Sequence, residues 1–370
     1  PEKTSSIEAG FEAAFWDNRL CLDFTYYKTD SRNQILKLAT TAASGYTSQV
    51  RNAGHIRNRG YEIQLGAVPI QTSKGFRWNL DLNYGANSSK VVKLDDEGLI
   101  TSYRLYSSGI QILASVGEAY GTLFGTSYVR DANGNVVVDA NGLPKISTTN
   151  KTLGKFTPDW TGGISNTFSY RSLSLSFLID ASVGGSIFSN TNKTGKYTGV
   201  LANTLSGRDA EHGGLWYYTA AMGNNVRLPE SPSYSVSSDG LYYAQVNGQS
   251  TRVYQDGIMV EGVTESGSKN EEVVSAEKYY HRIYSIAEAN VYDASYVKLR
   301  EVALSYRLPR LWTQKLHLQE ASVTLTGRNL WTIYKSVPNI DPESALTTGN
   351  AQGVEAYSLP TTRSFGVNLS

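Results

Sequence analysis

The chain has 370 residues and carries 34 Lys and Arg against 33 Asp and Glu, a formal net charge of +1. So weak a charge, with no run of basic residues, argues against a nucleic-acid-binding protein. Hydrophobic residues make up 40% of the sequence, no apolar stretch approaches the roughly 18 residues of a membrane-spanning helix, and one cysteine excludes a disulfide framework or thiolate metal cluster.

The remaining composition favours strands and turns. There are 25 Tyr and 34 Gly, and Tyr favours strands whereas Gly favours turns. A transmembrane β-barrel can be this polar because only every second residue of a strand meets lipid. The chain begins at Pro1 without Met or a signal peptide, so we expect a partial or processed chain whose targeting signal lies upstream.

Apolar residues alternate with polar ones in three segments, 6–15, 76–86 and 173–183. This period of two predicts strands rather than helices. Eleven strand residues span roughly 36 Å, or roughly 25 Å when tilted, which matches the apolar band of an outer-membrane barrel. In the second segment we expect Phe76, Trp78, Leu80, Leu82 and Tyr84 to face lipid, and Arg77, Asn79, Asp81 and Asn83 to face the lumen.

Nine strands are expected in total. The first ends at residue 16, and the others lie at residues 20–36, 58–68, 76–92, 160–170, 173–187, 295–308, 318–331 and 363–370. Short connections at 17–18, 69–75, 171–172 and 309–315 alternate with long ones at about 37–57, 93–159, 184–293 and 335–361. Outer-membrane barrels place turns in the periplasm and long loops outside the cell. The pattern therefore predicts extracellular long loops, residues 184–293 above all, and a periplasmic C-terminus. A soluble barrel or sandwich with insertions remains the alternative.

No residue pattern predicts an enzyme or a metal site. The four histidines are scattered without metal-ligand spacing: His55, His212, His281 and His317. Residues 131–142 faintly resemble a calcium loop but have Val136 and Gly142 where that loop needs Gly and Glu. We interpret them as the turn of a hairpin between residues 122–130 and 136–139. We expect no catalytic residue and no cofactor.

Aromatic residues gather in the long segment 184–293. Trp216, Tyr217 and Tyr218 follow a flexible Gly pair, and Arg208 and Asp209 lie shortly before it. Aromatic rings can stack on a sugar or peptide, and the charged pair can add hydrogen bonds. These five residues are our candidate substrate-binding residues. The alternative is that the aromatic rings pack the loop against the barrel rim or a partner protein.

Several motifs resemble the C-terminal barrel region of SusC/RagA-like TonB-dependent transporters of Bacteroidota. They are "PEKTSSIEAGF" from residue 1, "NAGHIRNRGYEIQL" at 52–65, "DWTGGISNTFSYRSLSLSFLIDASVGGSIF" at 159–188, "YDASYVKLREVALSYRLP" at 292–309, "LTGRNLWTIYKSVPNIDPE" at 325–343 and "LPTTRSFGVNL" at 359–369. They follow in order over the whole chain, 1–370, and the middle loop is generic.

The resemblance implies an all-β fold, a transmembrane antiparallel barrel of about 22 strands, of which this chain is the C-terminal part and lacks the plug domain. It implies active import of oligosaccharides or oligopeptides in the outer membrane. The implied partners are the lipid bilayer, a SusD-like surface lipoprotein as lid, and the TonB complex, which is contacted through an N-terminal region absent here. A dimer of transporter–lid pairs is compatible with it.

Arg300-Glu301 and Arg328-Asn329 are expected to form polar networks at the lumen or the periplasmic rim. A passive porin or a surface adhesin remains the alternative, and an outer-membrane enzyme the third reading.

Overall fold

A computed structural model describes residues 1–39, 43, 45–46, 48–95, 97–315 and 317–370. Its main body is a nine-stranded antiparallel sheet in which each strand pairs with the next one along the order β1-β2-β5-β6-β11-β12-β21-β22-β24. The strands are β1 (Lys3–Phe15), β2 (Leu20–Arg32), β5 (His55–Gln71), β6 (Phe76–Lys93), β11 (Trp160–Tyr170), β12 (Leu173–Val183), β21 (Tyr296–Arg307), β22 (Ser322–Lys335) and β24 (Ser364–Leu369). All nine expected strands are confirmed, with boundary shifts of a few residues.

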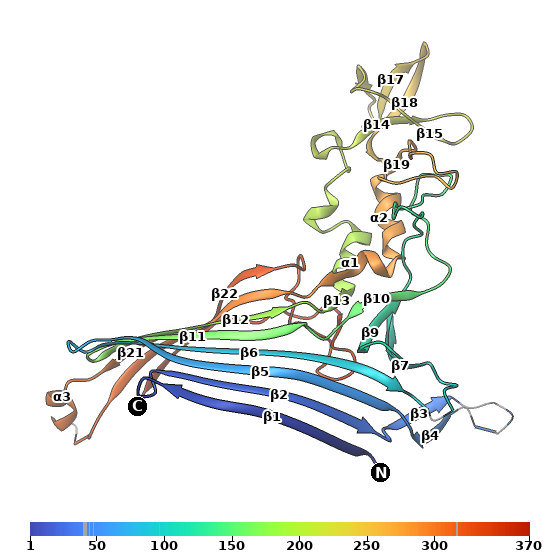
Figure 1. Ribbon diagram of the computed structural model, residues 1–370. Coiled ribbons are helices and arrows are strands. Elements are labelled where there is room, and N and C mark those ends of the chain that lie inside the picture. The colour runs from blue at the N-terminus through green and yellow to red at the C-terminus, as the bar shows by residue number, and fades with distance from the viewer. Residues whose placement is uncertain (40–42, 44, 47, 96, 316) are drawn as a thin grey trace.

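The connections alternate as expected, so that the long segments gather at one end of the curved sheet and the short turns at the other (Figure 1). At the short-turn end, the last connection contains helix α3 (Arg310–Lys315). The turn between β1 and β2 has three successive residues with positive φ, Trp16, Asp17 and Asn18. Strand β24 runs toward the short-turn end, so the C-terminus lies there (Figure 1). Residues 40–42, 44 and 47 of the first long segment, and 96 of the second, lie outside the described residues.

The long segments carry their own folded structure. The first holds the hairpin β3 (Ile35–Ala39) and β4 (Ser48–Asn52), and the second holds the sheet of β7 (Ser102–Ser108), β8 (Ile110–Ser115), β9 (Tyr120–Gly125) and β10 (Lys151–Lys155). The third begins with β13 (Ser186–Ser189) and α1 (Asn190–Thr198) and ends with α2 (Ala276–Tyr284) and β20 (Val291–Asp293). Between these helices it contains η2 (Ala202–Thr204), η3 (Ala210–His212), β14 (Leu215–Thr219), β15 (Asn225–Arg227), β16 (Tyr234–Val236), β17 (Tyr242–Val246), β18 (Gln249–Ile258) and β19 (Val274–Ser275), and after α2 comes η4 (Ala287–Asn290).

We call residues 215–275, from β14 through β19, the lobe. It stands away from the nine-stranded sheet (Figure 1). The fourth long segment, between β22 and β24, contains β23 (Val354–Glu355), which pairs with β13. The long segments thus pack against one another above the sheet, because a core of Ile110, Ile112, Leu123, Phe188, Ala287 and Val354 joins three of them.

The expected hairpin between residues 122–130 and 136–139 is only partly right. Arg130 and Val136 form an isolated bridge across the expected turn, but β9 pairs with β8 and β10 instead. The reason is burial, since Leu123 is fully buried in the shared core. The Asp131 carboxylate accepts hydrogen bonds from the backbone N–H groups of Asn133 and Asn135, so it closes its own turn. Among the described residues no group of three or more His, Cys, Asp or Glu could hold a metal.

The nine-stranded sheet has one apolar and one polar face. One row of directly paired residues runs Ala13, Leu22, Leu65, Leu82, Ile164, Ile179 and Leu299. The row on the other face that includes Asn83 runs Glu12, Asp23, Gln64, Asn83, Gly163 and Asp180. The expected alternation in β6 and β12 is therefore confirmed as two faces. Large hydrophobic side chains stay exposed on the apolar face, for example Ile7 at 71% and Phe11 at 54%.

Aromatic rings form two bands on the apolar face. Trp78 stacks on Phe168 near the short turns. Near the long segments, Tyr61 stacks on Tyr84, which contacts Trp160 with the two rings tilted. Asn166 interrupts this face, and the Trp78 indole N–H donates to its Oδ1 at 3.0 Å. That bond satisfies the side-chain oxygen of Asn166 on an otherwise apolar face. None of the described helices is long and apolar enough to cross a membrane.

Candidate functional site

The polar face of the sheet forms an open groove of about 730 Å³. Its polar lining comes from five neighbouring strands and comprises Glu12, Asp23, Gln64, Asp81, Asn83 and Ser165. Three of these side chains are carboxylates, and in the described part of the chain no Lys or Arg lines the groove. An open and acidic surface of this kind suits a passage for polar solutes better than an enclosed reaction site.

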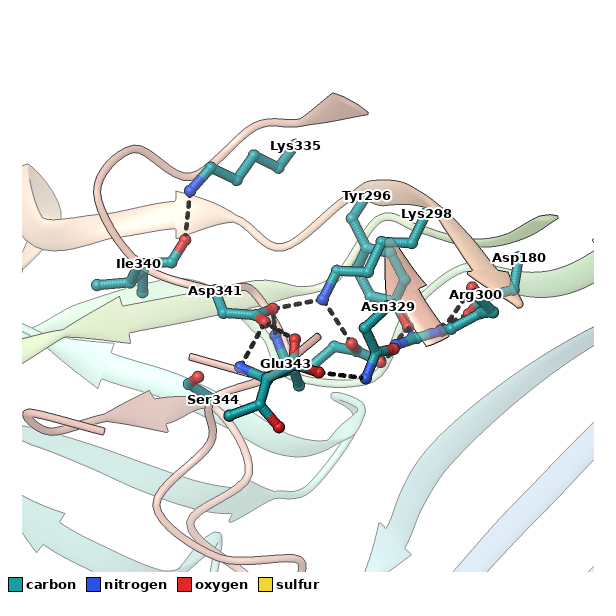
Figure 2. A network of polar contacts seen from close by, with 12 residues as sticks. Asp180, Tyr296, Lys298, Arg300, Asn329, Lys335, Ile340, Asp341, Glu343 and Ser344 are labelled. Carbon is teal, nitrogen blue, oxygen red and sulfur yellow. Dashed lines mark hydrogen bonds and ion pairs between the residues drawn. The ribbon is translucent and has the colours of Figure 1, made fainter. Parts of the chain in front are cut away.

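A buried ion network joins β12 and β21 to the segment between β22 and β24 (Figure 2). Lys298 Nζ in β21 contacts Asp341 Oδ1 and Glu343 Oε2, each at 2.6 Å. The side chains of Lys298 and Asp341 are only 4% and 8% exposed. Arg300 forms a two-armed ion pair with Asp180 at 2.6 and 3.0 Å and also contacts Glu343. Two cations of the sheet thus hold two carboxylates of the segment between β22 and β24.

A β-bulge explains how Arg300 reaches this network. The register of β21 against both neighbours shifts between Leu299 and Glu301, so Arg300 is the extra residue. A bulge turns a side chain that alternation would send to the other face. Arg300 and Glu301 therefore both lie on the polar face, where Glu301 pairs with Arg328 at 2.8 Å. The expectation of polar networks at Arg300-Glu301 and Arg328-Asn329 is confirmed, because Asn329 accepts from Arg300 and donates to the Thr362 carbonyl.

The network fixes the segment 336–363 against β12 and β21. Thr361 Oγ1 donates to Asp341 Oδ2 at 2.5 Å, and the buried Val337 and Ile340 pack on Ile187 of β13. Glu355 is fully buried and accepts hydrogen bonds from the hydroxyls of Ser189 and Thr191 at 2.6 Å each. The segment is therefore anchored to the sheet and to β13 through charge and apolar packing together.

Acid is expected to release this segment. Burial alone would raise the pKa of Asp341, but hydrogen bonds from Lys298 and Thr361 lower it to about 2. Because the folded pKa lies below the ordinary 3.8, its stabilising contribution is full above that value and is lost as pH falls toward about 2. The pKa of Glu343 is also lowered, by Arg300 and Lys298 acting against burial, and adds to the effect.

A spin label attached to cysteine at the exposed Thr348, in a Cys21→Ser background, measures this release. We expect its mobility to rise between pH 5 and pH 2, while a label at the exposed Met222 of the lobe serves as control. Unchanged mobility at Thr348 over this range would mean that the ion network does not hold the segment.

The structure places the five candidate substrate residues in two neighbouring parts of the third long segment. Trp216 is 7% exposed and packs on Tyr234 and Tyr242 inside the lobe. Tyr217 is 4% exposed, stacks on Tyr254 and donates to Asp256 at 3.1 Å. Both rings therefore pack the lobe in this structure. Tyr218 is half-buried at the edge of the same cluster.

Arg208 and Asp209 lie beside the lobe, between α1 and β14. Arg208 is exposed and donates to the Gly199 carbonyl and the Thr204 hydroxyl. Asp209 caps η3 by accepting from the backbone N–H of His212 and also contacts that ring at 2.7 Å. The structure does not bring the pair onto the Trp216 ring. That these five residues bind substrate stays a prediction.

Sequence reasoning missed a cavity of about 430 Å³ between α1, α2 and the lobe. Arg208 lines it together with Lys196, Asp256, Tyr280 and His281. Burial lowers the pKa of Lys196 to about 8, although its Nζ donates to the Ala289 carbonyl at 2.7 Å. Burial also raises the pKa of Asp256. The sequence could not predict this cavity, because Lys196 and His281 belong to different helices. These helices, α1 and α2, have nine residues each and lie far apart in the sequence.

The family model described as TonB dependent receptor-like, beta-barrel, matches residues 1–330. The chain belongs to this family. Curated relatives include TonB-dependent receptor P3 of Formosa agariphila, 26% identical over 398 residues, and TonB-dependent receptor P26 of the same organism, 24% identical over 399 residues. Each alignment covers 100% of this chain and 34% of the relative. The chain thus spans about a third of the length of these receptors.

Two solved structures have the same fold as this TonB-dependent receptor-like barrel chain. "Structure of the RagAB peptide transporter" matches with a TM-score of 0.61 at 20% identity, over 100% of this chain and 35% of that one. The RagAB peptide importer in the "open-open" state matches with a TM-score of 0.61 at 18% identity, over 100% of this chain and 34% of that one. At these identities the likeness concerns the fold.

Membership of this family indicates which face of the sheet meets lipid and which faces the lumen. TonB-dependent receptors are outer-membrane transporters and not enzymes. The nine-stranded sheet is therefore a section of barrel wall, with its apolar face toward lipid and its acidic groove toward the lumen. The Lys298–Asp341 network then fixes a long segment at the mouth of the barrel.

Proposed function

We propose that the chain forms the C-terminal part of the barrel of a TonB-energised importer for oligosaccharides or oligopeptides. The observation that carries this proposal is the family match over residues 1–330 together with a wall that is apolar outside and acidic inside. The two RagAB proteins are a peptide transporter and a peptide importer, which favours oligopeptides as the substrate class. The TonB complex would be contacted by a part of the whole receptor outside this chain.

We further propose that the long segments face the outside of the cell and the C-terminus faces the periplasm. Support comes from the gathering of all four long segments at one end of the sheet (Figure 1). The lobe projects from that end, where a SusD-like surface lipoprotein would close as a lid. Two such transporter–lid pairs would form the dimer.

Removing the lobe tests the lid proposal. Residues 215 and 275 are separated by a single strand, since Gly257 of β18 pairs with Leu215 on one side and Ser275 on the other. A short Gly-Ser linker can therefore replace residues 215–274 in the full-length receptor. We expect normal heat-modifiable migration of the barrel but reduced co-purification of the lid and reduced uptake. Full recovery of the lid and normal uptake would rule out this role of the lobe.

We also propose that substrate reaches the lobe side containing Arg208, Asp209 and Trp216–Tyr218 before it enters the groove. Among these, Arg208 is exposed, Asp209 and Tyr218 are half-buried, and the buried Trp216 and Tyr217 would hold the surface in shape. Tyr218→Ala should weaken substrate binding severalfold, because one stacking contact contributes about 1 kcal/mol.

Calorimetry on the purified transporter–lid complex measures the effect, with Tyr243→Ala as the matched control on β17. The competing explanation is that these aromatic residues only pack the lobe. In that case Trp216→Ala lowers lobe stability by about 3–5 kcal/mol, and neither Trp216→Ala nor Tyr218→Ala changes the dissociation constant. An unchanged constant for Tyr218→Ala would refute the contact.

The second candidate is a passive porin or a surface adhesin built on the same wall, which the open groove alone would also allow. A strain lacking the full-length gene distinguishes import from an adhesin. We expect it to lose uptake of one class of oligomer from a panel of glycans and peptides. Retained uptake of every oligomer, with lost surface attachment, would favour the adhesin.

A further inference from the structure

Basic side chains gather on the apolar, outward face of four strands. They lie between the aromatic band of Tyr61, Tyr84 and Trp160 and the long segments. The register pairs Lys28 directly with Arg59, Arg57 with Lys90, and Lys3 with Arg32. Along their strands these residues lie an even number of positions from outward residues such as Phe24, Ile63 and Ile7. Their side chains therefore point to the same face. We call these six residues the basic patch.

The position of the basic patch along the strands is set by the aromatic band. Lys28 follows Tyr26 by two residues and Arg59 precedes Tyr61 by two, so both lie about 7 Å farther toward the long segments. Tyr61 stacks on Tyr84 with ring centroids 5.9 Å apart. Aromatic rings of outer-membrane barrels occupy the membrane–water interface. The basic patch therefore lies at the level of the lipid headgroups.

The charge of the basic patch is poorly balanced within the chain. Directly paired side chains on a sheet have Cβ atoms about 4.5–5.5 Å apart, and like charges in such pairs are destabilising. On this face of the four strands, Asp30 is the only carboxylate among the described residues, and it is bound to Arg57 at 2.9 Å and His55 at 2.5 Å. Lys3, Lys28, Arg32, Arg59 and Lys90 form no ion pair with the described residues.

We propose that the basic patch binds the phosphorylated headgroup of a glycolipid in the outer leaflet of the membrane. A phosphate between Lys28 and Arg59 would convert a repulsive pair into two charge-assisted hydrogen bonds. The acyl chains of the same lipid would lie along the exposed apolar residues nearer the short turns, among them Phe11 and Phe15. Contact with both headgroup and chains favours a lipid over free phosphate. The assignment to the outer leaflet rests on the proposed function, which places the long segments outside the cell.

The test uses the full-length receptor in detergent micelles and native mass spectrometry of the lipid it retains. The probes are a purified phosphorylated glycolipid, the same glycolipid after removal of its phosphates, and inorganic phosphate. We expect the double variant Lys28→Gln, Arg59→Gln to bind the phosphorylated glycolipid about tenfold more weakly than wild type. The control variant Lys74→Gln, Arg310→Gln removes two exposed cations at the short-turn end and should bind normally.

Equal binding by wild type and the Lys28, Arg59 variant would overturn the inference, as would equal weakening in the control. Equal binding of the dephosphorylated glycolipid, or equally tight binding of inorganic phosphate, would also overturn it. Heat-modifiable migration confirms that each variant is folded. Because binding is measured in micelles, it does not depend on orientation or transport. Failure of the proposed orientation would appear separately, as absence of surface labelling at Met222 of the lobe in intact cells.

Discussion

Replacing Lys298 with Met is expected to lower the free energy of unfolding at the mouth of the barrel by about 3–5 kcal/mol, because it leaves a buried carboxylate without its cation. Asp341 is 8% exposed and would lose its 2.6 Å contact. Glu343 would keep Arg300, so Asp341 carries most of the cost. Chemical denaturation in detergent, followed by proteolysis of residues 336–363, measures the change.

Two further variants make the Lys298 result specific. Lys335→Met removes a neighbouring lysine whose Nζ donates only to the Ile340 carbonyl at 2.7 Å, so it should cost about 1 kcal/mol (Figure 2). Adding Asp341→Asn to Lys298→Met removes the unpaired charge and should recover part of the lost stability. If Lys298→Met costs no more than Lys335→Met, the ion network is not what anchors the segment.

Leu80→Arg is expected to destabilise the barrel by about 2–4 kcal/mol, the cost of a basic side chain near the membrane midplane. Leu80 lies on the outward face of β6, between Trp78 and Tyr84 of the two aromatic bands. Asn83→Arg is the matched change on the other face, where Asp23 and Asp81 line the groove. It should be nearly neutral. Folding titrations into bilayers compare the two, and equal damage from both would show that the faces are wrongly assigned.

The nine strands and their two faces could be predicted because both depend only on residues that are close together in the sequence. Alternation in β6 and β12 requires only neighbouring residues, and the short turn at Arg171 follows from the position of the flanking strands. Asn166 broke the apolar pattern between the two aromatic bands, and its side chain depends on the Trp78 indole N–H from a strand 88 residues away. Local sequence does not reveal such a pairing.

The polar network could be predicted only in outline. The motif around Arg300 indicated a polar cluster, but alternation would place Arg300 and Glu301 on opposite faces. The bulge that puts them on one face depends on the register of two neighbouring strands. Asp341 and Glu343 come from a segment more than 40 residues later, and their role depends on the fold of that segment.

The lobe shows the limit of composition as a guide to function. A Trp-Tyr-Tyr run in a polar segment indicated a binding surface, yet Trp216 forms a small core with Ala244 and Val253. Periodicity over five residues of β14 does not tell which ring is covered, because β16, β17 and β18 supply the cover.

The measurement that tests active import most directly is uptake of the identified oligomer by cells that carry the full-length receptor, with and without TonB. The outward face, the acidic groove and the family together predict uptake that stops when TonB is removed or the proton-motive force is dissipated, while the substrate still binds at the cell surface. Uptake that continues unchanged without TonB would contradict the account and identify a passive pore.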